Sequence, residues 1–133
     1  FEVRLAVEEA PRTAANALAL AARGFFDGLT FHRVISDFVI QGGCPNGVGN
    51  GHPGYSIDCE VGPGKPKHQR GSLSMAHAGP NTGGSQFFIC IADNRSLPKQ
   101  YNLFGTVEAG MHVALETKQG DTMATVVIEE IDR

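Results

Sequence analysis

The segment Thr30–Gly43, with the sequence TFHRVISDFVIQGG, constrains the fold of this chain more than any other part of it. Large strand-favouring side chains fill Leu29–Ile35, and Phe38–Gln41 is a second short apolar strand. The polar pair Ser36-Asp37 lies between them and is typical of a turn. The segment therefore predicts an apolar β-hairpin.

Three polar side chains, His32, Arg33 and Gln41, interrupt this apolar hairpin. Burying a cation or an amide costs free energy unless the group forms hydrogen bonds. Arg33 either extends to solvent or pairs with an acid, or it lines an apolar groove together with Gln41 and binds a polar ligand. The hairpin alone leaves both interpretations open.

A second unusual segment, Gly71–Ile91, reads GSLSMAHAGPNTGGSQFFICI. Its amide side chain, Gln86, directly precedes Phe87 and Phe88 in a predicted strand. The two segments together supply two amides, one guanidinium and several phenylalanines. They contain no obvious nucleophile, no carboxylate pair and no phosphate-binding loop, which disfavours hydrolytic and phosphoryl-transfer chemistry.

The rest of the chain predicts short strands separated by turns, with two helices. Further strands are expected at Glu2–Val7, Ser56–Glu60, Ser72–Met75, Phe87–Ile91, Leu103–Val107 and Ala124–Ile131, and helices at Ala14–Arg23 (after Pro11) and Met111–Thr117. The 17 glycines and 7 prolines fit a β-rich domain with many turns. Periodicity alone does not distinguish a β-sandwich from a closed barrel.

Composition and motifs exclude several classes of function. The net charge of −3 makes nucleic acid an unexpected partner, and no apolar run approaches the roughly 20 residues of a membrane span. The glycine-rich segment Cys44–Tyr55 lacks the GK[ST] sequence of a phosphate loop. We expect a cytoplasmic monomer, although the chain starts at Phe1 without methionine, so the natural N-terminus is trimmed or not included.

The three cysteines leave alternatives open. Cys90 lies in a predicted strand and is expected to be a small buried apolar residue. Cys44 and Cys59, with fourteen residues between them, match no standard zinc spacing. They are free thiols, a disulfide or redox pair, or metal ligands. The hypothesis we carry forward is a redox pair without a metal, because a glycine-rich loop of this length brings its ends together readily.

Two long motifs resemble a known family. FHRVISDFVIQGG followed by GSLSMAHAGPNTGGSQFFI closely resembles the signature of the cyclophilins, the peptidyl-prolyl cis/trans isomerases. NALALAARGFFDGLTFHRVI and NLFGTVEAGMHV match the same family in the same order, so the resemblance covers nearly the whole chain. It implies one isomerase domain over residues 1–133, in a compact prokaryotic-like form. The implied fold is mainly β, a closed eight-stranded antiparallel barrel capped by two α-helices.

The resemblance also implies a set of site residues, with no metal and no cofactor. Arg33 would be the catalytic arginine, and Gln41 would orient it and the substrate carbonyl. The proline pocket would be formed by Phe38, Val39, Phe88 and Leu97, with Phe104 as a further aromatic. The residues implied to hold the peptide are Ala76 and His77 through their backbone, Gln86 through its side chain, and Tyr101, at a position where many members carry histidine.

The chain departs from the family pattern at two positions of that site. Val39 replaces a common methionine, which predicts a shallower pocket floor. Ser96 stands where many members carry tryptophan, a residue associated in the family with cyclosporin affinity. We therefore expect cyclosporin to bind this protein more weakly than it binds tryptophan-bearing relatives.

Two functions of different classes fit these residues. The first is an isomerase that binds Xaa-Pro segments of proteins and accelerates rotation about the prolyl bond. The alternative is a docking module for proline-containing peptides with little turnover. Arg33 favours the enzyme, because docking alone does not need a fixed cation in the groove. A redox sensor based on Cys44 and Cys59 is compatible with either function.

Overall fold

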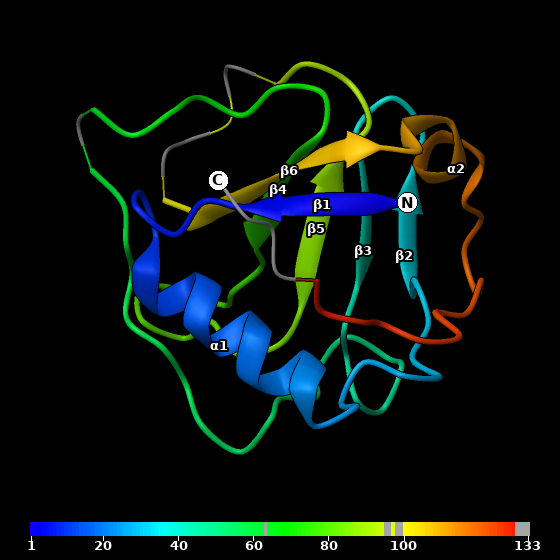
Figure 1. Ribbon diagram of the computed structural model, residues 1–133, viewed down its shortest axis with the longest axis horizontal. Helices are drawn as coiled ribbons and strands as arrows, with labels where there is room; N and C mark the ends of the chain where they lie inside the picture. Colours follow the sequence, from blue (N-terminus) through cyan, green and yellow to red (C-terminus); the bar gives the residue numbers. More distant parts are fainter. Residues whose placement is uncertain (63, 95–96, 98–99, 130–133) are drawn as a thin grey trace.

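The computed structural model describes residues 1–62, 64–94, 97 and 100–129 of the 133-residue chain, which form a mainly β structure with two helices (Figure 1). The strands are β1 (Glu2–Leu5), β2 (Arg33–Ile35), β3 (Val39–Gly42), β4 (Ser72–Met75), β5 (Phe87–Cys90) and β6 (Leu103–Ala109). The helices are α1 (Pro11–Ala22) and α2 (Met111–Glu116). All six strands join one antiparallel sheet in the order β1-β6-β4-β5-β3-β2.

The predicted closed eight-stranded barrel is wrong for the described residues, which form an open six-stranded sheet with β1 and β2 at its edges. The expected strand Ser56–Glu60 contributes only an isolated bridge between Ile57 and Gly83. Side chains replace a strand partner there, because Asn102 Oδ1 accepts the backbone N–H of Glu60 at 2.6 Å.

The expected closing strand Ala124–Ile131 is also wrong for its described part, since residues 124–129 carry no strand; residues 130 and 131 lie outside the described ranges. The backbone N–H of Val126 donates to Asp27 Oδ1 at 2.8 Å instead of to a neighbouring strand. Val127 is 77% exposed in the described part of the chain, so its side chain is not packed into the core. Residues 124–129 therefore have strand-favouring side chains but do not pair with a strand of the sheet.

Helix α1 follows the predicted signals at both ends. Pro11 occupies the first turn, where its missing N–H costs no helical hydrogen bond, and Gly24 after the last turn takes φ +72°. The N-cap residue Ala10 provides no side-chain cap. The Glu60 carboxylate replaces it, accepting the backbone N–H of Thr13 at 2.6 Å and that of Arg12 at 3.1 Å.

The sheet separates two clusters of buried side chains. The larger cluster contains Ala10, Phe31, Ile40, Leu73, Met75, Ile89, Phe104 and Ala114. The smaller cluster contains Val39, Phe88 and Cys90, with Phe38, Ala76, Leu97 and Tyr101 packed against it. Successive residues of β3 and β5 alternate between the clusters because side chains of a strand point to opposite faces. The smaller cluster therefore defines a second apolar face.

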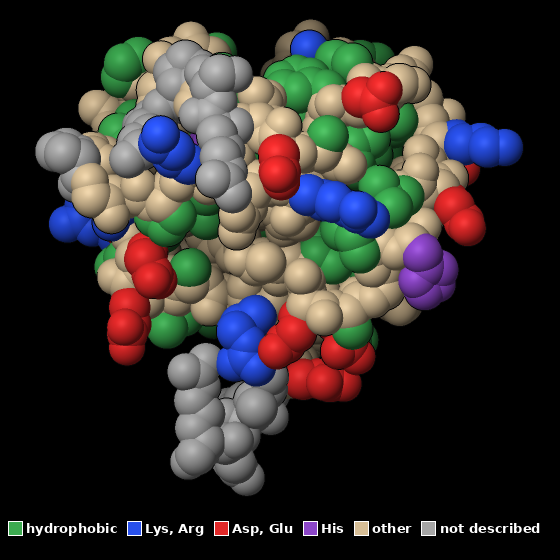
Figure 2. Space-filling model, turned by 90° about the horizontal axis from the view of Figure 1, so that it is seen from above, with side chains coloured by type: hydrophobic (Ala, Val, Ile, Leu, Met, Phe, Trp, Pro, Cys, Tyr) green, Lys and Arg blue, Asp and Glu red, His purple; other side chains and the backbone are tan. Residues whose placement is uncertain are grey.

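Charged side chains of both signs are interspersed on the face of the molecule seen in Figure 2. This mixture agrees with the small net charge of −3. Within the described ranges, no helix is long and apolar enough to cross a membrane.

Candidate functional site

The predicted hairpin forms and places Arg33 directly opposite Gln41. Strands β2 and β3 pair in the register Arg33–Gln41, and Asp37 in the turn takes a left-handed φ of 57°. The next pairings place Gln41 opposite Phe88 on β5, and Phe88 opposite Ser74 on β4. Residues directly opposite in antiparallel strands share a face. One row of side chains, contributed by four strands, therefore crosses the sheet from Arg33 to Ser74.

A chain of hydrogen bonds fixes the polar end of this row. Arg33 Nη1 donates to Gln41 Oε1 at 3.1 Å, and Gln41 Nε2 donates to Gln86 Oε1 at 3.2 Å. Gln86 Nε2 then donates to the carbonyl oxygens of Gly49 at 2.8 Å and Gly51 at 3.1 Å. Each amide has its oxygen and nitrogen oriented by its neighbours, so the guanidinium is anchored by a neutral acceptor.

Arg33 retains donor capacity for a ligand. Its side chain is exposed, and among the described residues no carboxylate lies within ion-pair distance of it. A guanidinium carries five N–H donors, of which the bond to Gln41 uses one. Pairing with an acid is therefore not observed. The Arg33 side chain extends toward solvent and also lies at the rim of an apolar hollow.

The hollow has a volume of about 160 Å³. It is lined by Arg33, Phe38, Val39, Gln41, Ala76, His77, Phe88, Leu97 and Tyr101. All nine were expected as site residues, and the structure brings them together from β2, β3, β5 and three loops. The apolar members belong to or pack against the smaller cluster, so the hollow has an apolar floor and a polar rim.

Gln86 lies behind this lining and reaches the hollow through its bond to Gln41. His77 and Tyr101 form one wall as stacked rings, with centroids 4.6 Å apart. The His77 ring is fixed on both sides, because Nε2 lies 2.7 Å from the Gln100 carbonyl oxygen and Nδ1 accepts the backbone N–H of Gly79 at 3.0 Å. A preformed aromatic wall of this kind limits the orientations that a bound chain can take.

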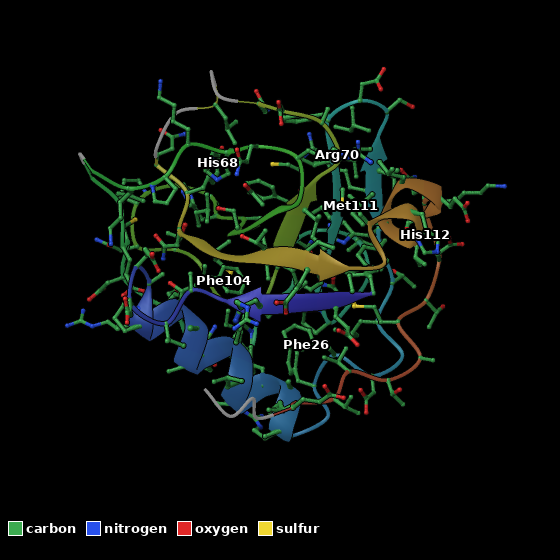
Figure 3. All side chains as sticks on the ribbon, turned by 45° about the horizontal axis from the view of Figure 1, so that its top comes forward. Phe26, His68, Arg70, Phe104, Met111 and His112 are labelled. Atoms are coloured by element: carbon green, nitrogen blue, oxygen red, sulfur yellow. The ribbon has the colours of Figure 1, made fainter. Side chains whose placement is uncertain are left out.

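The expectation that Phe104 lines the pocket is wrong. Phe104 is buried in the larger cluster, on the other side of the sheet from the hollow, and Figure 3 shows it on the side of β6 nearer α1. The register explains this placement, because its neighbour Leu103 pairs with Ser74 in the Arg33–Ser74 row. Side chains alternate along a strand, so Phe104 must face the opposite way.

The sequence interpretation missed His68, which supports the floor of the hollow. Its ring is 1% exposed and stacks on Phe88 with centroids 5.8 Å apart, and Nε2 lies 2.9 Å from Ser74 Oγ. Burial lowers the pKa of His68 below its ordinary value. A loop of sequence GPGKPKH gave no apolar pattern to signal a buried ring.

His32, the residue before Arg33, lies close to the Gln86 amide. Burial, the charge of Arg33 and a hydrogen bond with Gln86 act on its pKa, and the first two prevail and lower it. Among the described residues, His32 Nδ1 is buried without a hydrogen-bond partner. A neutral ring at this position is consistent with a structural role.

The predicted redox pair receives no support. Cys44 and Cys59 are free thiols, and the described residues show no bond between them. Cys44 Sγ bonds within its own loop, whereas Cys59 Sγ accepts the backbone N–H of Asn81 at 3.2 Å. In residues 1–62, 64–94, 97 and 100–129, no group of three or more His, Cys, Asp or Glu side chains could hold a metal ion.

Comparison with known proteins places these features in a family. Residues 1–132 match the family described as "Cyclophilin type peptidyl-prolyl cis-trans isomerase/CLD". The chain is 51% identical over 129 residues to peptidyl-prolyl cis-trans isomerase B of Bacillus subtilis (strain 168), covering 97% of this chain and 90% of that protein. It is 49% identical over 127 residues to a peptidyl-prolyl cis-trans isomerase of Helicobacter pylori (strain ATCC 700392 / 26695), covering 94% and 78%.

Solved structures give the same result. A cyclophilin-type isomerase from Cryptosporidium parvum superposes with a TM-score of 0.87 at 33% identity, covering 98% of this chain and 91% of that chain. A crystal structure of the same protein in the presence of the dipeptide Ala-Pro superposes with a TM-score of 0.79 at 35% identity, covering 91% and 84%.

Proposed function

The chain belongs to the cyclophilin-type peptidyl-prolyl cis-trans isomerase family and has the activity of that family, and from this premise we propose that Arg33 is its catalytic residue. The reaction is rotation about an Xaa-Pro peptide bond. Amide resonance opposes rotation with a barrier of about 18–20 kcal/mol, and the uncatalysed change takes roughly tens to hundreds of seconds. Catalysis requires tighter binding of the twisted amide than of either planar form.

The twisted amide differs from the planar amide at its nitrogen. Rotation breaks the resonance, so the prolyl nitrogen regains a lone pair and can accept a hydrogen bond. A fixed cationic donor then stabilises the twisted state more than the ground state. Arg33 suits this role because its guanidinium is permanently charged and its bond to Gln41 limits its motion. No covalent bond is made or broken, and no proton is transferred.

The apolar floor is assigned to the proline ring. Phe38, Val39, Phe88 and Leu97 surround the hollow next to Arg33, a position that would hold the prolyl nitrogen within reach of the guanidinium. Gln41 would orient Arg33 and the substrate carbonyl. The peptide before the proline would run past Ala76, His77 and Tyr101, with the Gln86 amide near its path. The crystal structure of the Cryptosporidium protein with Ala-Pro supports an Xaa-Pro ligand.

The single observation that carries this proposal is the Arg33–Gln41 pair on the rim of an apolar hollow. The test is exchange spectroscopy on a short Ala-Pro peptide with catalytic amounts of the parent protein, Arg33→Ala and Arg4→Ala. Arg4 is a partly exposed arginine on β1, paired with Glu108, and its removal changes the net charge equally. We expect Arg33→Ala to abolish most of the exchange and Arg4→Ala to preserve it. Parent-like exchange with Arg33→Ala would refute the assignment.

The same experiment distinguishes the docking alternative. A docking module would shift and broaden the peptide signals on binding without accelerating cis/trans exchange. An isomerase produces exchange cross-peaks between the cis and trans signals at substoichiometric protein. Cross-peaks absent at a protein concentration that saturates the peptide would favour docking over turnover.

We also propose that cyclosporin inhibits this protein weakly. Ser96, the position that motivates the proposal, lies outside the described residues, so the argument rests on side-chain chemistry alone. An indole offers a large apolar surface and an N–H donor, whereas serine offers a short hydroxyl. Ser96→Trp should lower the inhibition constant for cyclosporin, and an unchanged constant would remove this proposal while leaving the isomerase assignment intact.

A further inference from the structure

The loop from Cys44 to Gly51 forms the far end of the hydrogen-bond chain that begins at Arg33. Gln86 Nε2 donates to the carbonyl oxygens of Gly49 and Gly51, at 2.8 and 3.1 Å. Both carbonyls belong to a segment without helix or strand, whose outer residues are exposed. The amide that orients Gln41 therefore depends on a loop that no regular secondary structure holds in place.

One buried atom holds both of these glycines. Cys44 Sγ accepts the backbone N–H of Gly49 at 3.3 Å and that of Gly51 at 3.2 Å, and its thiol donates to Asn46 Oδ1 at 2.9 Å. The Cys44 side chain is 1% exposed, in contrast to the loop around it. Gly49 and Gly51 thus direct their N–H groups to the sulfur and their carbonyl groups to Gln86.

Backbone geometry makes this arrangement depend on the sulfur. Gly49 takes φ +98°, a conformation that glycine adopts without strain but does not favour over others. A glycine-rich loop has many alternative conformations, and each bond that selects one of them reduces this freedom. The Cys44 sulfur supplies two such bonds at the residues whose carbonyls matter for Gln86.

We propose that Cys44 is a positioning residue for the isomerase reaction: its sulfur fixes the Gly49 and Gly51 carbonyls that orient Gln86, and through Gln41 it sets the position of Arg33. This inference rests on the proposed roles of Arg33 and Gln41. It goes beyond them because Cys44 is not among the residues lining the hollow and acts only through the loop.

The electrostatic surroundings of the sulfur agree with its role as an acceptor. Burial alone would raise the pKa of the Cys44 thiol, but the backbone N–H groups of Gly51, Gly49, Asn46 and Gly47 outweigh burial and lower it. The N–H of Gly47 donates to the Cys44 carbonyl oxygen, and the N–H groups of Gly49 and Gly51 donate to the sulfur itself. Alanine at this position would leave them without that acceptor, whereas serine would keep a smaller one.

The test compares three variants of the full chain: Cys44→Ala, Cys44→Ser and Val48→Ala. Val48 is 72% exposed at the tip of the same loop, so its truncation controls for general effects on the loop. We expect Cys44→Ala to lower kcat for an Ala-Pro peptide by roughly three- to tenfold, the loss that corresponds to one or two hydrogen bonds. The peptide dissociation constant should change by less than about twofold, because the floor of the hollow is intact. Cys44→Ser should recover most of kcat, and Val48→Ala should equal the parent.

A second measurement does not depend on turnover. The side-chain amide signals of Gln86 and Gln41 should shift in the ¹H–¹⁵N spectrum of Cys44→Ala and return toward their parent positions in Cys44→Ser. In Val48→Ala they should keep their parent positions. In the parent, the backbone amides of Gly49 and Gly51, which donate to the sulfur, should exchange with solvent more slowly than that of Asn50, for which the described residues show no acceptor. This second prediction applies even if Cys44→Ala does not fold.

The outcomes separate the two levels of inference. Parent-like kcat and unshifted Gln86 signals in Cys44→Ala, or rapid exchange at Gly49 and Gly51 in the parent, would overturn the role of Cys44. An equal loss of kcat in Val48→Ala would overturn it as well. Shifted Gln86 signals combined with full activity of Arg33→Ala would show instead that the loop positions the amides but that the proposed role of Arg33 is wrong.

Discussion

Replacing Phe88 with alanine should impair both folding stability and substrate binding, whereas replacing Phe104 should impair stability alone. The two rings are close in burial, with Phe88 6% and Phe104 3% exposed. They lie in separate clusters on opposite faces of the sheet, and only Phe88 lines the hollow. The pair therefore separates the effect of removing a buried ring from the effect of removing the proline site.

The magnitude follows from the surroundings of each ring. Truncating a fully buried phenylalanine costs about 3–5 kcal/mol in the free energy of unfolding. Phe88 stacks on His68 at 5.8 Å and meets Tyr101 edge-on at 5.5 Å, contacts that alanine loses. The open hollow beside Phe88 lets neighbours and water fill part of the space, so we expect about 3 kcal/mol for Phe88→Ala and about 4 kcal/mol for Phe104→Ala.

Phe88→Ala should also weaken the binding of an Ala-Pro peptide. At about 25 cal/mol per Å², losing about 50–80 Å² of apolar contact with a proline ring costs about 1.3–2 kcal/mol. That cost corresponds to a rise of roughly 8- to 30-fold in the dissociation constant of an Ala-Pro peptide. Phe104→Ala should change this constant by less than about twofold, because its ring does not reach the hollow.

Urea unfolding gives the stability change, and peptide titration at a temperature where both variants are folded gives the dissociation constant. Phenylalanine-to-leucine versions, with a smaller stability loss of about 1–3 kcal/mol, replace any alanine variant that does not fold. Equal weakening of peptide binding by the two substitutions would show that the hollow is not the proline site. The same conclusion follows if Phe88→Ala leaves binding unchanged.

Two further predictions concern the support of the fold. Glu60→Gln should lower the free energy of unfolding by about 1 kcal/mol at pH 7, because the carboxylate caps α1 at Thr13. Burial would raise the pKa of Glu60, but hydrogen bonds from Thr13 and Arg12 lower it, so this stabilisation is full above about pH 4.5 and is lost as pH falls through the native pKa. Chemical unfolding of both proteins should therefore give a smaller difference in the free energy of unfolding at pH 3 than at pH 7, and an equal difference at the two pH values would contradict the cap. Gly43→Ala should destabilise the protein far more than Gly28→Ala, although both glycines have φ above +80°. A Cβ at Gly43 would clash with a backbone carbonyl oxygen, whereas a Cβ at Gly28 meets nothing within 4 Å. Similar melting temperatures of the two variants would refute this comparison.

Local pattern was enough to predict the hairpin and its polar residues. The apolar runs on either side of Ser36-Asp37 specify two strands, but not their register. A two-residue turn there would pair Arg33 with Ile40, whereas the structure has three residues between Ile35 and Val39 and so pairs Arg33 with Gln41. The family resemblance supplied the rest of the lining, which no periodicity in the loops around Ala76 or Leu97 would have indicated.

Features that depend on distant pairing could not be predicted in this way. The direction of Phe104 depends on the register between β4 and β6, which contains an irregularity between Leu73 and Ser74. The cap of α1 comes from Glu60, 47 residues away from Thr13 along the chain, and no capping sequence precedes the helix. Strand propensity at residues 124–129 likewise does not specify a partner, since pairing needs a free edge in the right place.

Arg33 is proposed to act on the twisted amide and not on the bound ground state. The most direct test measures kcat and the peptide dissociation constant separately for the parent and Arg33→Ala, by exchange spectroscopy under saturating peptide and by titration. Loss of one preorganised donor should lower kcat by about 10²–10³-fold while the dissociation constant changes by less than about threefold. A large rise in the dissociation constant with unchanged kcat would contradict the claim and make Arg33 a residue for binding alone.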